Sequence, residues 1–183
     1  ETIPKPENIF GKLMFEAENI YLKNKNNLIF RHGFVFGIGR FGSLRGMIHS
    51  EINNYKEQSL IDDSRKIYPI SSRYFVKRIL SEVENNTNGI VHVSGRDNSS
   101  KYKLTKDIFQ SLNLDDSHLK SFSDTKSKNK LIERPSNIRL FDNNVSSCYA
   151  LDSMVKDLAL MSRCSFELIY GSKKTYSLLK HKL

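Results

Sequence analysis

A glycine-rich loop is the part of the sequence whose spacing most directly suggests chemistry. Its residues, Gly37-Ile-Gly-Arg-Phe-Gly42, have the spacing G-x-G-x-x-G and follow an apolar stretch that predicts a strand. Glycines at this spacing let the backbone approach a pyrophosphate at a helix N-terminus, and an acidic residue is expected about 20 residues later. Asp62 and Asp63 are close to that position. One interpretation is therefore that a dinucleotide-binding unit starts here, with Arg40 and Arg45 available for phosphate groups.

Two observations count against this interpretation. Isolated matches to G-x-G-x-x-G are common by chance. The chain beyond Gly42 is also too short for the remaining strand and helix units of a complete dinucleotide-binding fold. Other chemistry is not indicated, because Cys148 and Cys164 have no metal-ligand spacing and no metal site is predicted.

The N-terminal segment reads as a helix that follows a proline-rich turn. Pro4 and Pro6 keep the preceding residues extended. Apolar residues then recur at helical spacing, which predicts a buried stripe on one face. The members of this stripe are Ile9, Leu13, Ala17, Ile20 and Tyr21.

The order of Glu1, Pro4, Asn8, Gly11 and Glu18 is distinctive. It resembles the segment E-x-x-P-x-x-P-x-N-x-Y-G-x-x-K-x-x-x-E of the extended short-chain dehydrogenase/reductases, above all the dTDP-4-dehydrorhamnose reductases, with the proline spacing one residue shorter. The resemblance implies an α/β fold, namely the C-terminal part of a Rossmann-type fold with a small α/β substrate-binding lobe. It also implies a cofactor-binding half upstream, and Glu1 in place of an initiating Met suggests a fragment or a processed chain.

Phe10 and Met14 occupy the positions of the family's catalytic Tyr and Lys. In the family the Tyr phenol is the general acid/base, and the Lys lowers the pKa of that phenol. Phe10 has no ionisable proton and Met14 has no charge, so neither can do this work. Lys12 cannot substitute, since residue i+2 lies on another side of the helix from Phe10. We expect no catalytic residue, with Phe10, Met14 and Arg31 at the positions that face NADP or NAD in the intact family; binding of either cofactor by this fragment alone is not expected.

Further matches continue the resemblance over residues 1–142. The segments Arg31–Gly37, Gly89–Gly95, Ser99–Tyr102 and Arg134–Asp142 each resemble a family segment. Under this alignment the glycine-rich loop follows the sixth strand and borders a sugar nucleotide. The resemblance implies substrate contacts from Phe34, Gly37, Arg40 and Arg65. Residues 143–183 are expected to form a divergent α/β tail of unknown role.

The apolar pattern predicts the elements that hold these residues. A buried strand is expected over Leu28–Phe36, and a helix over residues 43–54. Ser71 or Ser72 should cap a helix that buries Phe75, Val76, Ile79 and Leu80, and a later helix should bury Leu104, Ile108, Phe109 and Leu112. Residues 117–130 should form a surface loop or an edge segment. A helix, a strand and a helix are expected over residues 151–161, 165–170 and 174–183.

Composition limits the classes of function. The chain has 183 residues, a net charge of +9 and 38% hydrophobic residues, which suits one globular domain. Its basic clusters do not interleave aromatic residues, and no nucleic-acid-binding motif is present, so the sequence disfavours nucleic-acid binding. No apolar run approaches the roughly 20 residues that span a membrane. A cytoplasmic protein is expected.

The sequence therefore predicts a catalytically degenerate homologue of the nucleotide-sugar reductases and epimerases, in deoxysugar or polysaccharide biosynthesis. Its expected ligand is a nucleotide sugar, and a homodimer is compatible with the fold. The alternative is a non-catalytic regulatory or binding subunit on the same scaffold, like the beta subunit of methionine adenosyltransferase.

Overall fold

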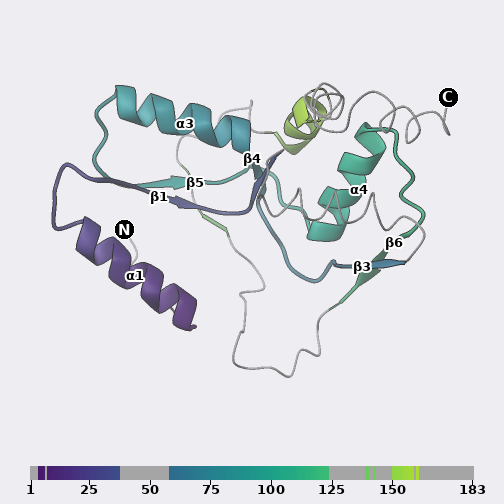
Figure 1. Ribbon diagram of the computed structural model, residues 1–183, viewed down its shortest axis with the longest axis horizontal. Helices are drawn as coiled ribbons and strands as arrows, with labels where there is room; N and C mark the ends of the chain where they lie inside the picture. The colour runs from purple at the N-terminus through teal and green to yellow at the C-terminus, as the bar shows by residue number, and fades with distance from the viewer. Residues whose placement is uncertain are drawn as a thin grey trace, which may run out of the picture.

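The described part of the chain contains both helices and parallel strands (Figure 1). The computed structural model describes residues 4–6, 8–37, 58–123, 139–140, 142, 150–158 and 160. Its strands form three parallel pairs, a pattern that requires crossover connections and confirms the predicted α/β class. The pairs are β1 (Leu28–His32) with β5 (Gly89–Val93), β2 (Val35–Phe36) with β4 (Ile70–Ser71), and β3 (Ser59–Asp62) with β6 (Leu119–Phe122).

Two helices, α1 (Ile9–Tyr21) and α3 (Ser72–Glu84), cover opposite faces of the β1–β5 sheet (Figure 1). Successive residues of a strand point to opposite faces, and β1 follows this rule. The ring of Phe30 meets Phe75 of α3 edge-on, with 6.2 Å between the ring centroids. The next residue, Arg31, instead forms an ion pair with Glu18 of α1. The two helices are therefore held to one strand from its two sides.

The predicted single strand over Leu28–Phe36 is wrong, because two strands occupy this stretch. β1 ends at His32, where the Gly33 amide donates to the Val93 carbonyl at 3.2 Å. The chain then changes partner, and the Ile70 amide donates to the Phe34 carbonyl at 2.9 Å. Apolar residues continue across the break, so the sequence pattern did not reveal the change of partner.

The predicted N-terminal helix is confirmed, but its buried stripe is wrong. The helix begins after Asn8, whose side chain accepts a hydrogen bond from the Gly11 amide at 2.8 Å. Ile9 and Leu13 are 69% and 59% exposed, and no residue of α1 is fully buried. The helix meets the sheet through another side, which includes Glu18. Its apolar stripe consequently faces outward.

The helix predicted after Ser71 is also confirmed, with Ser71 as its cap. Its predicted burial is wrong for Val76 and Leu80, which are exposed. The buried residues of α3 are instead Arg78 and Glu82, whose side chains pair at 2.6 Å. Helical periodicity identified residues that share a face without identifying the face that meets the sheet.

The hydrophobic core lies around α4 (Lys101–Ser111), away from α1. As predicted, α4 and the following turn bury Leu104, Ile108, Phe109 and Leu112. Helical residues 151–158 pack against the same core, where the Ser71 amide lies 3.3 Å from the Met154 sulfur. β6 confirms the expected edge segment. No helix of the described part of the chain is long and apolar enough to cross a membrane. The elements predicted at residues 43–54, 165–170 and 174–183 lie outside the described residues.

Candidate functional site

Residues with useful chemistry gather where the parallel strands end. Phe34 follows β1, Gly37 follows β2, Arg65 follows β3, and Lys101 is the first residue of α4. Ligands of parallel α/β sheets bind beyond the carboxyl ends of the strands, where helix N-termini also point. We call Phe34, Arg65, Tyr68, Lys101 and Arg139 the cation–aromatic cluster.

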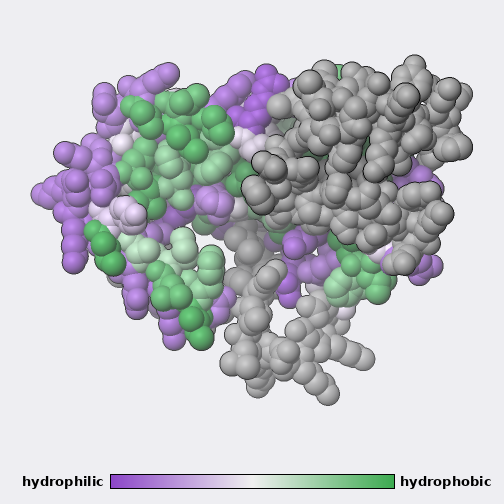
Figure 2. Space-filling model, in the orientation of Figure 1, coloured by the Kyte–Doolittle hydropathy of each residue, from purple (hydrophilic) through white to green (hydrophobic). Residues whose placement is uncertain are grey.

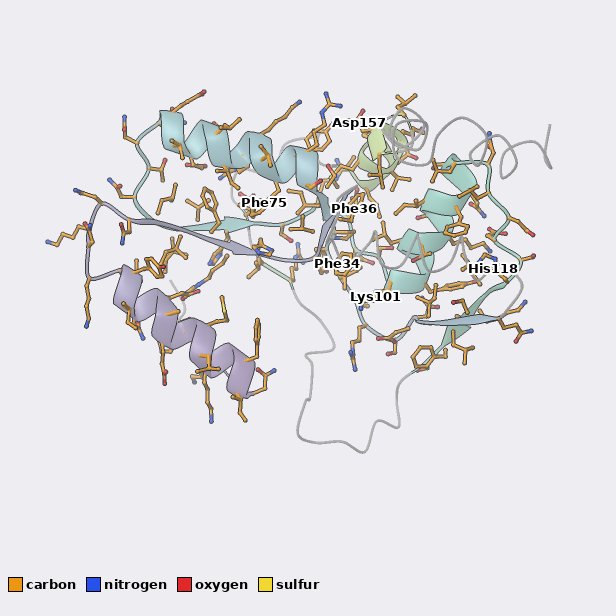
Figure 3. All side chains as sticks on the ribbon, in the orientation of Figure 1. Phe34, Phe36, Phe75, Lys101, His118 and Asp157 are labelled. Carbon is orange, nitrogen blue, oxygen red and sulfur yellow. The ribbon has the colours of Figure 1, made fainter. Side chains whose placement is uncertain are left out.

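In this cluster a cationic side chain lies over each of two aromatic rings. The Lys101 Nζ lies 5.9 Å from the centroid of the Phe34 ring, and Figure 3 shows the two residues together between the β1–β5 sheet and α4. The Arg139 guanidinium lies 5.5 Å from the centroid of the Tyr68 ring. The two rings lie on adjacent backbone segments, because the Ile70 amide donates to the Phe34 carbonyl. Cations and aromatic faces in this arrangement can bind anionic groups and flat rings side by side.

Asp62, the last residue of β3, contacts one of the cations. The Arg65 Nε is 3.6 Å from an Asp62 carboxylate oxygen. Burial acts to raise the pKa of Asp62, but hydrogen bonds from Ser64 and the charges of Arg65 and Lys101 outweigh it and lower the pKa below its usual value. Asp62 is therefore ionised at neutral pH, and its contact holds Arg65 near the carboxyl end of β3.

The N-terminus of α4 adds further positive potential to the cluster. The Ser100 side chain caps the helix by accepting a hydrogen bond from the Lys103 amide at 3.0 Å. Its hydroxyl donates to the Asp63 carboxylate, which ties the helix start to the loop after β3. A helix N-terminus carries a partial positive charge, so Lys101 and the helix dipole favour the same anion.

Gly37 marks a close approach between β2 and the start of α3. A Cβ atom at this position would lie 2.0 Å from the Ser72 hydroxyl oxygen, so no larger side chain fits without a rearrangement. The structure thus places Gly37 against Ser72, at the carboxyl end of β2. Arg40, the other substrate residue predicted from this loop, lies outside the described residues.

The residues predicted to face the cofactor lie on α1 and β1. Phe10 and Met14 are 73% and 50% exposed, and their side chains offer no hydrogen-bond donor. The Arg31 guanidinium binds Glu18 through two nitrogens, at 3.0 and 2.7 Å. Neither a phenol nor an ammonium group is present at these three positions.

A cavity of about 560 Å³ lies on another side of α4. Its lining includes Asp97, Asp107, Gln110 and Asp152, and none of the residues predicted from the sequence. Burial raises the pKa of Asp107, and the nearby Asp152 carboxylate acts in the same direction. The cavity therefore disfavours anions, unlike the cation–aromatic cluster.

Three of the substrate residues predicted from the sequence, Phe34, Gly37 and Arg65, each follow a strand at its carboxyl end. The sequence analysis did not single out Lys101 or Arg139. The sequence could have indicated Lys101, because this residue directly follows Ser100, which caps a helix, and the helix starts soon after a predicted strand. Arg139 carried no such signal, since only its position over the Tyr68 ring reveals it.

A protein-family model described as the RmlD substrate binding domain matches residues 1–157. The chain belongs to this family. The matched range includes the carboxyl ends of the six described strands and the N-termini of α3 and α4. It also extends past residue 142 into the helical segment 151–158.

Solved structures of nucleotide-sugar enzymes share the fold of this RmlD-type domain. A dTDP-4-dehydrorhamnose reductase from Clostridium acetobutylicum has a TM-score of 0.75 at 17% identity, over 88% of this chain and 58% of the other. A Bacillus anthracis reductase of the same name, in complex with NADP, has a TM-score of 0.74 at 18% identity, over 87% and 58%. A dTDP-glucose 4,6-dehydratase from Bacillus anthracis, in complex with NAD, has a TM-score of 0.68 at 9% identity, over 91% and 56%.

The RmlD-type domain spans less than two thirds of each of these chains. At these identities the likeness shows the fold, an extended short-chain dehydrogenase/reductase scaffold of the nucleotide-sugar reductase type. No curated protein sequence matches the chain significantly.

Proposed function

We propose that this chain binds a nucleotide sugar at the cation–aromatic cluster and supplies no acid–base pair of its own. The single observation that carries the proposal is the placement of Lys101 over Phe34 at the carboxyl ends of the strands. The family's substrate-binding role and the names of the similar structures support a nucleotide sugar as the ligand class. The proposed biological context is deoxysugar or polysaccharide biosynthesis.

Each part of the cluster suits one part of such a ligand. Lys101, Arg65 and the N-terminus of α4 can offset the charge of a diphosphate. The face of Phe34 can pack against a base or a sugar ring. Asp62 and Asp63 fix the positions of Arg65 and of the start of α4, because they contact Arg65 and Ser100.

The reacting end of the family's site is different in this chain. Phe10 and Met14 cannot donate or accept a proton, so α1 cannot protonate a sugar oxygen. NADP or NAD would supply hydride in the intact family, but the residues at the three expected positions do not fit that cofactor. The proposed role is therefore recognition of the nucleotide sugar, with any redox chemistry lost from this chain.

Calorimetric titration with dTDP-glucose tests this proposal. We expect saturable binding of one ligand per chain, with Lys101→Ala weakening it about tenfold, the effect of losing one charged contact to phosphate. Lys103→Ala is the matched control, because Lys103 lies on the same helix but lines the acidic cavity. Equal binding by the two variants would place the ligand elsewhere, and no binding by the unaltered chain would refute the proposed function.

A further inference from the structure

The face of α1 that lies toward the β1–β5 sheet contains one charged residue. The half-buried residues of the helix are Gly11, Phe15, Ala17 and Glu18, and none of its residues is fully buried. The Glu18 carboxylate accepts hydrogen bonds from the Arg31 guanidinium of β1 through both of its oxygens, at 3.0 and 2.7 Å. The two side chains are only 16% and 17% exposed, so water screens their charges weakly. This ion pair therefore contributes much of the attachment of α1 to the sheet.

A histidine of the neighbouring strand lies against the same ion pair. His92 is the partner of Arg31 in the parallel register of β1 and β5, so both side chains project from one face of the sheet. This is the face toward α1, because the adjacent Phe30 projects toward α3 on the opposite face (Figure 1). The Arg31 Nη1 lies 3.5 Å from the His92 Nε2. Since a guanidinium can only donate, Nε2 can accept from it only while that nitrogen carries no proton.

A proton on His92 changes the balance of charge at this contact. The charged groups that face the imidazole are Arg31 from β1 and Glu18 from α1, one cation and one anion. An imidazolium adds a second cation, which the guanidinium repels at this short distance. Both oxygens of Glu18 already bind Arg31, so an imidazolium has to compete for that carboxylate. Histidine is the side chain whose charge ordinarily changes between about pH 5 and 8.

We propose that protonation of His92 releases α1 from the β1–β5 sheet. With a neutral imidazole, Glu18 and Arg31 hold the helix on the sheet. With an imidazolium, repulsion of Arg31 and competition for Glu18 disfavour the docked helix, so the released helix binds the proton more readily. By linkage, docking is favoured at neutral pH and is lost as the pH falls.

The helix that responds to the proton is the one that carries Phe10 and Met14. Its few half-buried residues offer little apolar area to hold it once the ion pair weakens. The cation–aromatic cluster contains no residue of α1, β1 or β5, so the switch does not depend on nucleotide-sugar binding. Acid therefore moves the helix at the reacting end of the family's site while the cluster keeps its residues in place.

Amide hydrogen exchange of the chain of 183 residues tests this switch. Exchange is measured at about pH 7.5 and about pH 5.5, on either side of the ordinary histidine titration, and is normalised to the intrinsic rate at each pH. We expect the protection of α1 to fall about tenfold at the lower pH, a coupling within the usual range for linked sites. The protection of α4, which lies in the hydrophobic core, should not change.

Two matched substitutions identify the responsible histidine. In His92→Gln the amide oxygen can still accept from Arg31 but takes up no proton, so α1 should stay protected at both pH values. His32→Gln is the control, because His32 ends the same strand but contacts Phe75 of α3 on the other face, and it should keep the tenfold fall. The proposal is wrong if the unaltered chain shows no fall, if α4 falls equally, or if His92→Gln keeps the fall or His32→Gln loses it.

A measurement on the unaltered chain keeps the test decisive should His92→Gln fail to fold. Nuclear magnetic resonance follows the ring signals of His92 and the amide signals of α1 through one pH titration. We expect the two sets of signals to share a midpoint, because one proton controls both. Separate midpoints, or α1 signals that do not respond between about pH 5 and 8, would overturn the proposal.

Discussion

One turn of α1 separates Phe10 from Met14, and this turn decides what the domain can do with a bound sugar. The two side chains lie on the same side of the helix, as the family's acid–base pair requires. A phenyl ring and a thioether keep the size and the apolar contacts of such a pair but exchange no proton. At the residue scale, the proposed function therefore leaves ligand recognition to Lys101, Arg65 and the aromatic face beside them.

Glu82 is the residue whose charge should matter most for the stability of α3. Its carboxylate accepts hydrogen bonds from Thr87 at 2.7 Å and from Arg78 at 2.6 Å. The hydrogen bond from Thr87 and the contact with Arg78 lower the pKa of Glu82 below its usual 4.5, although burial opposes them. We expect Glu82→Gln to reduce the free energy of unfolding by about 2 kcal/mol at pH 7.

The pH dependence of this effect has a definite sign. A lowered pKa contributes stability above the unfolded-state value near 4.5, and this contribution is lost as the pH falls through the folded-state pKa. The difference between Glu82→Gln and the unaltered chain should therefore shrink in acid denaturation series below pH 4.5. Glu84→Gln, at an exposed position of the same helix, is the control. A difference that grows toward low pH would contradict the assignment.

Gly95 should tolerate substitution less well than Gly33. A Cβ atom at Gly95 would lie 2.0 Å from the Pro69 carbonyl oxygen, which belongs to backbone and cannot rotate away. At Gly33 the nearest atom would be 3.4 Å away, an ordinary contact. Chemical denaturation should show Gly95→Ala losing about 2 kcal/mol and Gly33→Ala markedly less. Equal losses would argue against the close approach of Gly95 and Pro69.

At the scale of elements, the sequence predicted where helices form better than which side they bury. Leu104, Ile108 and Phe109 of α4 are buried as predicted, because this helix meets the core of the described chain. The stripes of α1 and of α3 have the same periodicity but face outward in whole or in part. Periodicity reports which residues share a face, and the neighbouring elements decide whether that face is covered.

The site illustrates the same limit. Phe34 and Gly37 could be found locally, because they end a predicted strand and follow a recognisable segment. Lys101 joins them only through the tertiary fold, which brings the start of α4 to the end of β1. The division of the expected strand at Gly33 could not be predicted for a similar reason. β1 pairs with β5 and β2 pairs with β4, but the apolar pattern is the same on both sides of Gly33.

Matched substitutions in α3 and α4 test the two kinds of helix face. In the chain of 183 residues, Leu80→Lys should change the free energy of unfolding by no more than about 0.5 kcal/mol, because Leu80 is exposed. Leu104→Ala should cost about 3 kcal/mol, because its side chain is fully buried. Urea denaturation measures both. A large loss for Leu80→Lys would show that the outer face of α3 is covered within this chain.

At the scale of the whole molecule, the described chain has two regions that differ in packing. The cation–aromatic cluster lies at the carboxyl ends of the strands, beside the well-packed core around α4 (Figure 3). The outer sides of α1 and α3 instead hold exposed apolar residues, and few side chains are buried there (Figure 2).

Mapping of amide chemical shifts by nuclear magnetic resonance, during titration with dTDP-glucose, tests the central claim most directly. The account predicts that the largest changes fall at Phe34, Arg65 and Lys101, with little change at Phe10 and Met14. Changes concentrated at Asp107 and Gln110, which line the acidic cavity, would contradict it, as would the absence of any change at saturating ligand.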